Sequence, residues 1–448
     1  MASTPRDDAQ PTRATTPVSQ DPETQQAQQG PLVPSTAQLA WQRDGLGVFF
    51  HFGVNTFAGK EWSDGTLTPE SFDPSELDAD EWIRTAHELG AKYVVLTAKH
   101  HDGFCLWPTA TTDYSVASSP WKGGTGDVVR EVADACARSG MKLGLYASPW
   151  DRNAPQYEEP AAYDEFYLAQ LRELCTNYGE LSELWFDGAG SAGREYDWDA
   201  IGALAAELQP QAMVFNMGPA TIRWVGNEDG LAADPVEYVT TSTDLNNYDV
   251  DVVESGEAVY LPPECDVSLR KGWFWQPGEE PKSLSHLLAI HDRSIGLGAN
   301  LLLNIPPDRR GRIDPADAAR VHEFAEALAQ RFGSPHSGAL SASGSSARID
   351  LGAETDFDHI ELVERLAEGQ RVTGHRILLE DGTVLASGGT IGVRRIHRLE
   401  QAVRASGLVV ELSGEGAALV AASVHDATGA PTPDPDIAYR ATTERPDV

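Results

Sequence analysis

Short hydrophobic runs that end in polar residues are the clearest pattern in the first half of the chain. The runs that show it best are Val48–Phe50, Tyr93–Ala98 and Leu184–Phe186. They lead into His51, into the adjacent pair His100 and His101, and into Asp187. Each run has the composition of a buried strand, and the catalytic groups of a parallel α/β barrel lie at the C-terminal ends of its strands. The pattern therefore predicts an active-site rim that contains these polar residues.

Amphipathic helices are predicted between the runs. Asp78 or Asp80 is expected to cap a helix that Gly90 ends, and Asp127 a helix that Gly140 ends. Further helices are expected near 163–178, 198–208 and 314–330, and further strands at 142–147, 212–216, 258–261 and 300–305. This alternation predicts an α/β fold, with a catalytic (β/α)8-like TIM barrel over residues 38–335. A doubly wound sheet shares the alternation, but no Gly-x-Gly-x-x-Gly fingerprint follows a strand.

The pattern changes after a stretch rich in Gly, Ser and Pro at residues 331–346. Beyond this stretch, apolar and polar residues alternate as in half-buried strands, at 347–351, 359–363, 375–379 and 407–412. We therefore expect a C-terminal β-sandwich over residues 340–428. Residues 1–37 have little apolar surface and are predicted to form a disordered tail, and residues 429–448 a loose one.

The chain is strongly acidic, with 68 acidic against 34 basic residues and a formal net charge of −34. This charge argues against nucleic acid and anionic membranes as partners, whereas a neutral sugar is not repelled. No apolar run approaches the roughly 20 residues that span a bilayer. Residues 1–37 contain no apolar segment typical of a secretory signal, so a cytoplasmic location is expected. The 4 cysteines form no C-x-x-C pair, which argues against a disulfide framework or a zinc site.

Four ordered motifs give the chain a resemblance to a known family. They are Phe50–Gly53 around His51, Glu61–Ser63, Lys99–Phe104 and Trp185–Gly188. Together they resemble the α-L-fucosidases of glycoside hydrolase family 29, over roughly residues 42–307. Later segments resemble the subgroup that prefers branched α-1,3/1,4-linked fucose: Arg223–Glu228, Glu264–Asp266 and Gly272–Trp275. The resemblance implies a retaining exo-α-L-fucosidase that acts on fucosylated oligosaccharides of Lewis type and needs no metal or cofactor.

The same resemblance implies that Asp187 is the nucleophile and Glu228 the acid/base. A retaining glycosidase uses two carboxyl groups about 5–5.5 Å apart, one to attack the anomeric carbon and one to protonate the leaving oxygen. The acid needs a raised pKa, which the apolar neighbours Trp224 and Val225 and the charge of the nucleophile are expected to supply. Asp229, adjacent to Glu228, stays open as a rival acid.

A further set of residues is expected to bind substrate: His51, Glu61, Trp62, His100, His101, Tyr146, Arg223, Asp266 and Trp273. Neutral imidazoles offer one donor and one acceptor each to sugar hydroxyls. A zinc site formed by these histidines and Asp102 is the competing interpretation. Trp273 or Trp275 is expected to cover the methyl group of fucose, or else to pack between barrel and sandwich. Arg223 is expected to keep the nucleophile ionised, or is a surface charge, and Asp266 to reach a branched leaving group.

Two other functions stay open from the sequence alone. The chain could be an α-L-fucosidase of broad specificity, or a carbohydrate-binding barrel that has lost its chemistry. The presence of both Asp187 and Glu228 favours an enzyme over a binding module. The sequence leads to no prediction of the natural glycan or of the oligomeric state.

Overall fold

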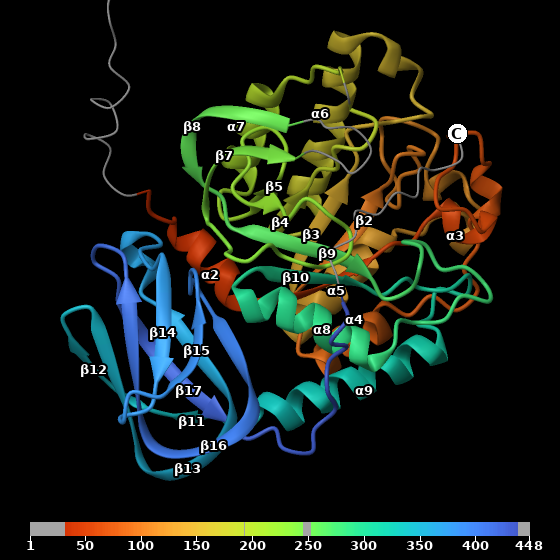
Figure 1. Ribbon diagram of the computed structural model, residues 1–448. Coiled ribbons are helices and arrows are strands. Elements are labelled where there is room, and N and C mark those ends of the chain that lie inside the picture. The colour runs from red at the N-terminus through yellow and green to blue at the C-terminus, as the bar shows by residue number, and fades with distance from the viewer. Residues whose placement is uncertain (1–31, 192, 245–251, 438–448) are drawn as a thin grey trace, which may run out of the picture.

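A parallel eight-stranded sheet, nearly closed into a barrel, forms the larger part of the molecule (Figure 1). The computed structural model describes residues 32–191, 193–244 and 252–437. In hydrogen-bonded order the strands are β5 (Met213–Phe215), β4 (Leu181–Trp185), β3 (Lys142–Ala147), β2 (Tyr93–Lys99), β1 (Leu46–Phe50), β10 (Asn300–Asn304), β9 (Pro263–Ser268) and β6 (Arg223–Trp224). A single parallel bridge between Phe215 and Ile222 joins the two ends of the sheet. The predicted barrel is confirmed.

The helices lie around the sheet, as the strand composition requires. Every residue of β1 and of β2 is buried, and a parallel strand buried on both faces needs such a continuous hydrophobic run. The helices are α2 (Thr36–Asp44), α3 (Val54–Ala58), α4 (Ala79–Leu89), α5 (Val128–Ser139), α6 (Pro160–Asn177), α7 (Trp198–Leu208), α8 (Leu284–Arg293) and α9 (Pro315–Phe332). Helix α2 begins just before the predicted barrel boundary at residue 38, and residues 1–31 of the predicted tail lie outside the described residues.

The predicted helix caps are confirmed. Asp78, and not Asp80, caps α4, because its carboxylate accepts the N–H of Glu81 at 3.0 Å. Asp127 caps α5 in the same way. The glycines that follow these helices have φ of 90° and 73°, which lie in the left-handed region that side chains with a Cβ rarely adopt.

The strand predicted at 258–261 does not belong to the barrel. It is the end of β8 (Val252–Tyr260), which pairs antiparallel with β7 (Val239–Asp244) in a separate hairpin. Strand β9, which carries Glu264 and Asp266, takes the place in the barrel. A hairpin strand and a barrel strand have similar hydrophobic patterns. Strand β9 lacks a long apolar run, because Glu264 and Asp266 bind side chains of other barrel strands.

The C-terminal unit is an antiparallel β-sandwich, as predicted. Its strands are β11 (His336–Ser337), β17 (Leu419–His425), β13 (Ser346–Glu364), β16 (Arg395–Ser413), β14 (Gly374–Leu378) and β15 (Val384–Gly388), with β12 (Ala339–Ser343) paired to β13. The two strands predicted at 347–351 and 359–363 are the ends of the single strand β13. Irregular pairing near Asp350 and Thr355 divides it, which explains why it resembles two strands.

The chain returns to the barrel after β17. The N–H of Asp434 donates to the carbonyl of Ser285 at 2.8 Å, and Ile437 packs against the hydrophobic core of the barrel. Figure 1 shows this dark-blue segment running from the sandwich towards α8. Residues 429–437 contain no helix or strand, and the rest of the predicted loose tail lies outside the described residues. No helix in the described part of the chain is long and apolar enough to cross a membrane.

Candidate active site

A pocket with an empty volume of about 580 Å³ opens at the C-terminal ends of the barrel strands. Most of the predicted site residues line it: His51, Trp62, His100, His101, Tyr146, Asp187, Glu228, Asp266 and Trp273. His51 follows β1, His100 and His101 follow β2, and Asp187 follows β4. The strand-end rule applied to the sequence thus predicted groups that share one pocket.

Asp187 is held by three donors on one side of the pocket. The Tyr146 hydroxyl donates to Oδ2 at 2.9 Å, the N–H of Ala189 donates to Oδ1 at 2.8 Å, and His101 Nε2 lies 3.4 Å from Oδ2. Burial raises the pKa of this carboxyl, but the charge of His101 and these hydrogen bonds lower it further than burial raises it. The net pKa lies below the usual aspartate value. Asp187 is therefore a fixed carboxylate, the form that a nucleophile needs.

The ring of His101 is fixed from behind. The Ser148 hydroxyl donates to the carbonyl of Trp150 at 2.7 Å, so its oxygen accepts from His101 Nδ1, also at 2.7 Å. The rings of Trp62 and Trp150 pack beside the imidazole, with centroid distances of 4.9 and 5.2 Å. This arrangement points Nε2 at the carboxylate of Asp187.

Glu228 faces the same pocket in the opposite electrostatic state. Its side chain is partly exposed and lines the pocket. Burial first, then the negative charges of Asp187 and Glu61, raise the pKa of Glu228 to about 8. A hydrogen bond from the side chain of Trp273 lowers it by less. At neutral pH Glu228 is a protonated acid next to an ionised Asp187, which is the division of roles that acid-assisted displacement at a sugar carbon requires.

His51 and His100 are neutral hydrogen-bonding groups of the pocket. Burial lowers the pKa of His51 to about 3 and that of His100 well below its usual value. The amide nitrogen of Asn304 donates to Ser268 and to the carbonyl of Trp273, so its Oδ1 accepts from His51 Nδ1 at 3.0 Å. His51 Nε2 is then left as an acceptor. Within the described residues, no three His, Cys, Asp or Glu side chains are grouped to hold a metal ion.

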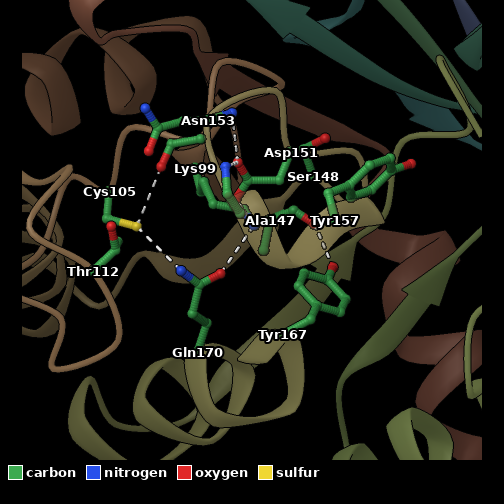
Figure 2. Close-up of polar contacts among 12 residues, drawn as sticks. Lys99, Cys105, Thr112, Ala147, Ser148, Asp151, Asn153, Tyr157, Tyr167 and Gln170 are labelled. Carbon is green, nitrogen blue, oxygen red and sulfur yellow. Dashed lines mark hydrogen bonds and ion pairs between the residues drawn. The ribbon is translucent and has the colours of Figure 1, made fainter. Parts of the chain in front are cut away.

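A buried ion pair supports the strand end that carries the two adjacent histidines. Lys99 Nζ lies 3.1 Å from Asp151 Oδ2, and neither side chain is more than 2% exposed. Lys99 also donates to Gln170 of α6 at 2.9 Å, and Asp151 accepts the N–H groups of Asn153 and Ala154 (Figure 2). The ion pair connects β2, the loop after β3 and α6, and therefore fixes two sides of the pocket at once.

Two of the predicted binding residues lie outside the pocket lining. Glu61 accepts the backbone N–H of Trp273 at 2.7 Å, so it positions this ring and acts on Glu228 through its charge. Arg223 donates to the carbonyls of Trp224 and Glu237 and does not line the pocket beside the nucleophile. Neighbouring residues of a strand point to opposite faces, and in β6 Trp224 takes the face towards the pocket.

Asp266 lines the pocket and is almost fully enclosed. It is 3% exposed, and the indole N–H of Trp224 donates to it at 2.6 Å. Burial and the charge of Glu228 raise its pKa well above the aspartate value. We therefore assign Asp266 to the deep wall of the pocket, near the acid.

Several pocket residues were not singled out as site residues from the sequence: Phe49, Trp185, Phe215, Asn216 and Trp224. Asn216 follows β5 directly, so the rule that identified His51 and Asp187 would also have identified it. Its φ of 59° is left-handed, a conformation that Asn adopts more readily than most residues. The aromatic residues occur inside hydrophobic strands, where sequence alone does not separate pocket walls from core.

Comparison with known proteins identifies the family to which this pocket belongs. The model of the family described as Alpha-L-fucosidase matches residues 66–331. The chain belongs to the α-L-fucosidase family. This fucosidase is 44% identical over 302 residues to alpha-L-fucosidase 1 of Arabidopsis thaliana, which covers 66% of this chain and 60% of that protein. A relative from Oryza sativa subsp. japonica, named for the same family, is 38% identical over 86% of this chain and 82% of its own length.

Solved structures agree with this membership. A glycoside hydrolase 29 family member from an unknown rumen bacterium has a TM-score of 0.79 and 35% identity, over 91% of this fucosidase and 79% of that chain. A Ruminococcus gnavus GH29 fucosidase in complex with fucose has a TM-score of 0.78 and 28% identity, over 89% of this chain and 96% of that one. The fucosidase is thus a glycoside hydrolase with the fold of its family.

Proposed function

We propose that this fucosidase releases L-fucose with retention of configuration, with Asp187 as nucleophile and Glu228 as acid/base. The observation that carries the proposal is the opposite displacement of the two pKa values in one pocket: below the usual value for Asp187 and to about 8 for Glu228. Asp187 is also the carboxylate that His101 and Tyr146 hold in place. Asp229 is not among the residues that line this pocket, so Glu228 is the better candidate for the acid.

The proposed reaction has two displacements. In the first, an oxygen of Asp187 forms a bond to the anomeric carbon while the bond to the leaving oxygen breaks, and Glu228 gives its proton to that oxygen. In the second, Glu228, now a carboxylate, takes a proton from water as the water oxygen attacks the same carbon and Asp187 departs. Each displacement inverts the anomeric centre, so that the two together retain its configuration.

We further propose a preference for α-1,3- and α-1,4-linked fucose on a branched, Lewis-type leaving group. The support is the resemblance of the segments around Arg223–Glu228 and Gly272–Trp275 to the subgroup with this preference. Contacts with a neighbouring galactose raise the rate only if they strengthen in the transition state. A fucosidase of broad specificity is the second candidate, since family membership alone is compatible with either.

The experiment for the mechanism is proton NMR of early product. α-L-Fucose must appear first if the mechanism is retaining, and the β anomer only later by mutarotation. β-L-Fucose as the first product would contradict the retaining assignment. The experiment for specificity is a panel of a Lewis trisaccharide, an α-1,2-linked disaccharide, an α-1,6-linked disaccharide and an aryl fucoside. A higher kcat/KM on the trisaccharide supports the preference, and equal values on all four contradict it.

A further inference from the structure

A second cavity, with an empty volume of about 950 Å³, lies beside the active-site pocket. The two cavities share two lining residues, Glu228 and Trp273. Glu228 is the proposed proton donor to the leaving oxygen. The leaving group must therefore lie next to Glu228, and the second cavity opens on that acid.

Another cavity nearby does not meet this condition. It lies by the β7–β8 hairpin, has an empty volume of about 1,080 Å³, and shares only Asn216 with the active-site pocket. Neither proposed catalytic carboxyl lines it. The cavity at Glu228 is therefore the better candidate for the leaving group.

One wall of the cavity at Glu228 comes from the end of the described chain. Asp434, Asp436 and Ile437 line it, although the polypeptide reaches this point only after passing through the whole β-sandwich. Two contacts fix the segment: the N–H of Asp434 donates to Ser285 at 2.8 Å, and Ile437 packs on the barrel core. Asp434 Oδ1 also accepts the N–H of Asp436 at 2.9 Å, which keeps the two acidic residues in one turn.

We propose that residues 434–437 form the outer wall of the leaving-group subsite, and that Asp434 and Asp436 accept hydrogen bonds from hydroxyls of the leaving sugar. This inference rests on the proposed function, since it needs Glu228 as the acid. Carboxylates are pure acceptors and match the hydroxyl groups of a neutral sugar, and Lys271 in the same lining is a donor. Asp229, Asp434 and Asp436 outnumber Lys271 and Lys282 in the lining, so a neutral leaving group fits better than an anionic one.

The loop after β9, which lines the same cavity, is also held by hydrogen bonds. Lys282 donates to the carbonyls of Ser268 and Arg270 at 2.6 and 2.8 Å, which fixes the loop after β9 that carries Lys271. A lining that is positioned before binding costs less free energy to order when the substrate arrives. The C-terminal segment is thus a positioned surface on the leaving-group side of Glu228.

The test is the full-length double variant Asp434→Ala/Asp436→Ala, compared with Asp426→Ala. Asp426 is a matched control because its carboxylate also accepts the N–H two residues ahead, from Thr428 at 3.0 Å, yet it does not line the cavity. The readout is the ratio of kcat/KM on a fucosylated oligosaccharide to kcat/KM on α-L-fucosyl fluoride, whose leaving group is a single atom. Loss of a hydrogen bond to a charged group lowers this ratio by roughly tenfold or more.

A fall in the ratio for the double variant but not for Asp426→Ala supports the proposal. An unchanged ratio, or an equal loss on both substrates, overturns it. A second readout uses the free disaccharide galactosyl-N-acetylglucosamine as an inhibitor of fluoride hydrolysis, and its inhibition constant is expected to rise in the double variant. The oligosaccharide can be any that the wild-type enzyme cleaves, so this test does not depend on the proposed linkage preference. If that preference is wrong, the wild-type substrate panel shows it. If residues 434–437 do not contact the leaving sugar, the unchanged kcat/KM ratio of the double variant shows it.

Discussion

Asp187 and Glu228 have the same functional group, and their surroundings give them different protonation states. Asp187 gains a nearby His101 and donors from Tyr146 and Ala189, whereas Glu228 gains burial and negative neighbours. A difference of one pKa unit corresponds to about 1.4 kcal/mol between the two protonation states. The protein therefore sets the two roles by placing charges and donors, without any difference in side-chain chemistry.

Removal of the proposed nucleophile is expected to leave a site that an external anion can use. In Asp187→Gly, turnover of an aryl fucoside should collapse while substrate binding partly persists, because the pocket walls remain. Azide fits the space left by the carboxyl and should restore turnover by attacking the anomeric carbon directly. The product to look for by NMR is β-L-fucosyl azide. Recovery of activity with no azide adduct would point to a different nucleophile.

The loss of rate on removing the acid is expected to depend on the leaving group, and the activity of the wild-type enzyme on pH. Glu228→Ala should slow a natural glycan by about 10²–10⁴, the usual contribution of general acid catalysis, and should slow the first step less for a substrate with an activated leaving group. In the wild-type enzyme, kcat/KM should fall as pH rises through about 8, because Glu228 loses the proton that it must donate. The acidic limb should lie below the usual aspartate pKa. An alkaline limb that persists unchanged in Glu228→Ala would assign it to another group.

The strand-end rule predicted the catalytic pocket well because strand direction fixes where its polar residues meet. His51, His101 and Asp187 all line one pocket, although they are far apart in the sequence. Glu228 lines it too, but its role was inferred from the family resemblance and not from a strand end. The strand-end rule does not predict which way a side chain points in a short or irregular segment such as β6. Arg223 lies next to Trp224 and yet faces away, and the second cavity depends on Asp434, which no local motif connects with Glu228.

At the scale of elements, the packing of β2, the loop after β3 and α6 against one another depends on the buried ion pair between Lys99 and Asp151. Lys99→Met leaves Asp151 charged and buried, and breaking a buried pair in this way costs about 3–5 kcal/mol. Urea unfolding should show this loss, together with reduced activity because His100 and His101 follow directly. Lys142→Met is the matched control: its ion pair with Asp44 is at the surface, with the lysine side chain 47% exposed, so the cost should be at most about 1 kcal/mol. Equal losses in the two variants would contradict this account.

Helix ends were the most predictable elements, and polar strands the least. Asp78 and Asp127 have short-range partners three residues ahead, so a local sequence signal suffices. The acidic residues of β9 are satisfied only by distant partners, such as Glu264 by the Tyr93 hydroxyl at 2.5 Å and by the indole of Trp185 at 3.2 Å. Such a strand is stable only inside the closed barrel, and nothing in its own sequence indicates this.

At the scale of the whole molecule, the barrel and the sandwich are joined by specific polar contacts. Arg395 of the sandwich forms two hydrogen bonds of 2.8 Å with Asp234, and Gln370 bonds to the backbone of Val236 and Tyr238. We therefore expect one cooperative thermal transition, with equal calorimetric and van't Hoff enthalpies. Two separate transitions in differential scanning calorimetry would show that the units unfold independently.

The short strands β5 and β6 have a consequence for how such an enzyme can change over evolution. They contain only three and two residues, and one bridge closes the barrel between them. The loop that carries Glu228 begins at this seam, where few ladder hydrogen bonds are at stake. Insertions and replacements can accumulate there with little loss of folding free energy, while the well-paired strands β1 to β4 keep Asp187 and its histidines in place. New substrate ranges can therefore arise on one side of the pocket without rebuilding the side that performs the attack.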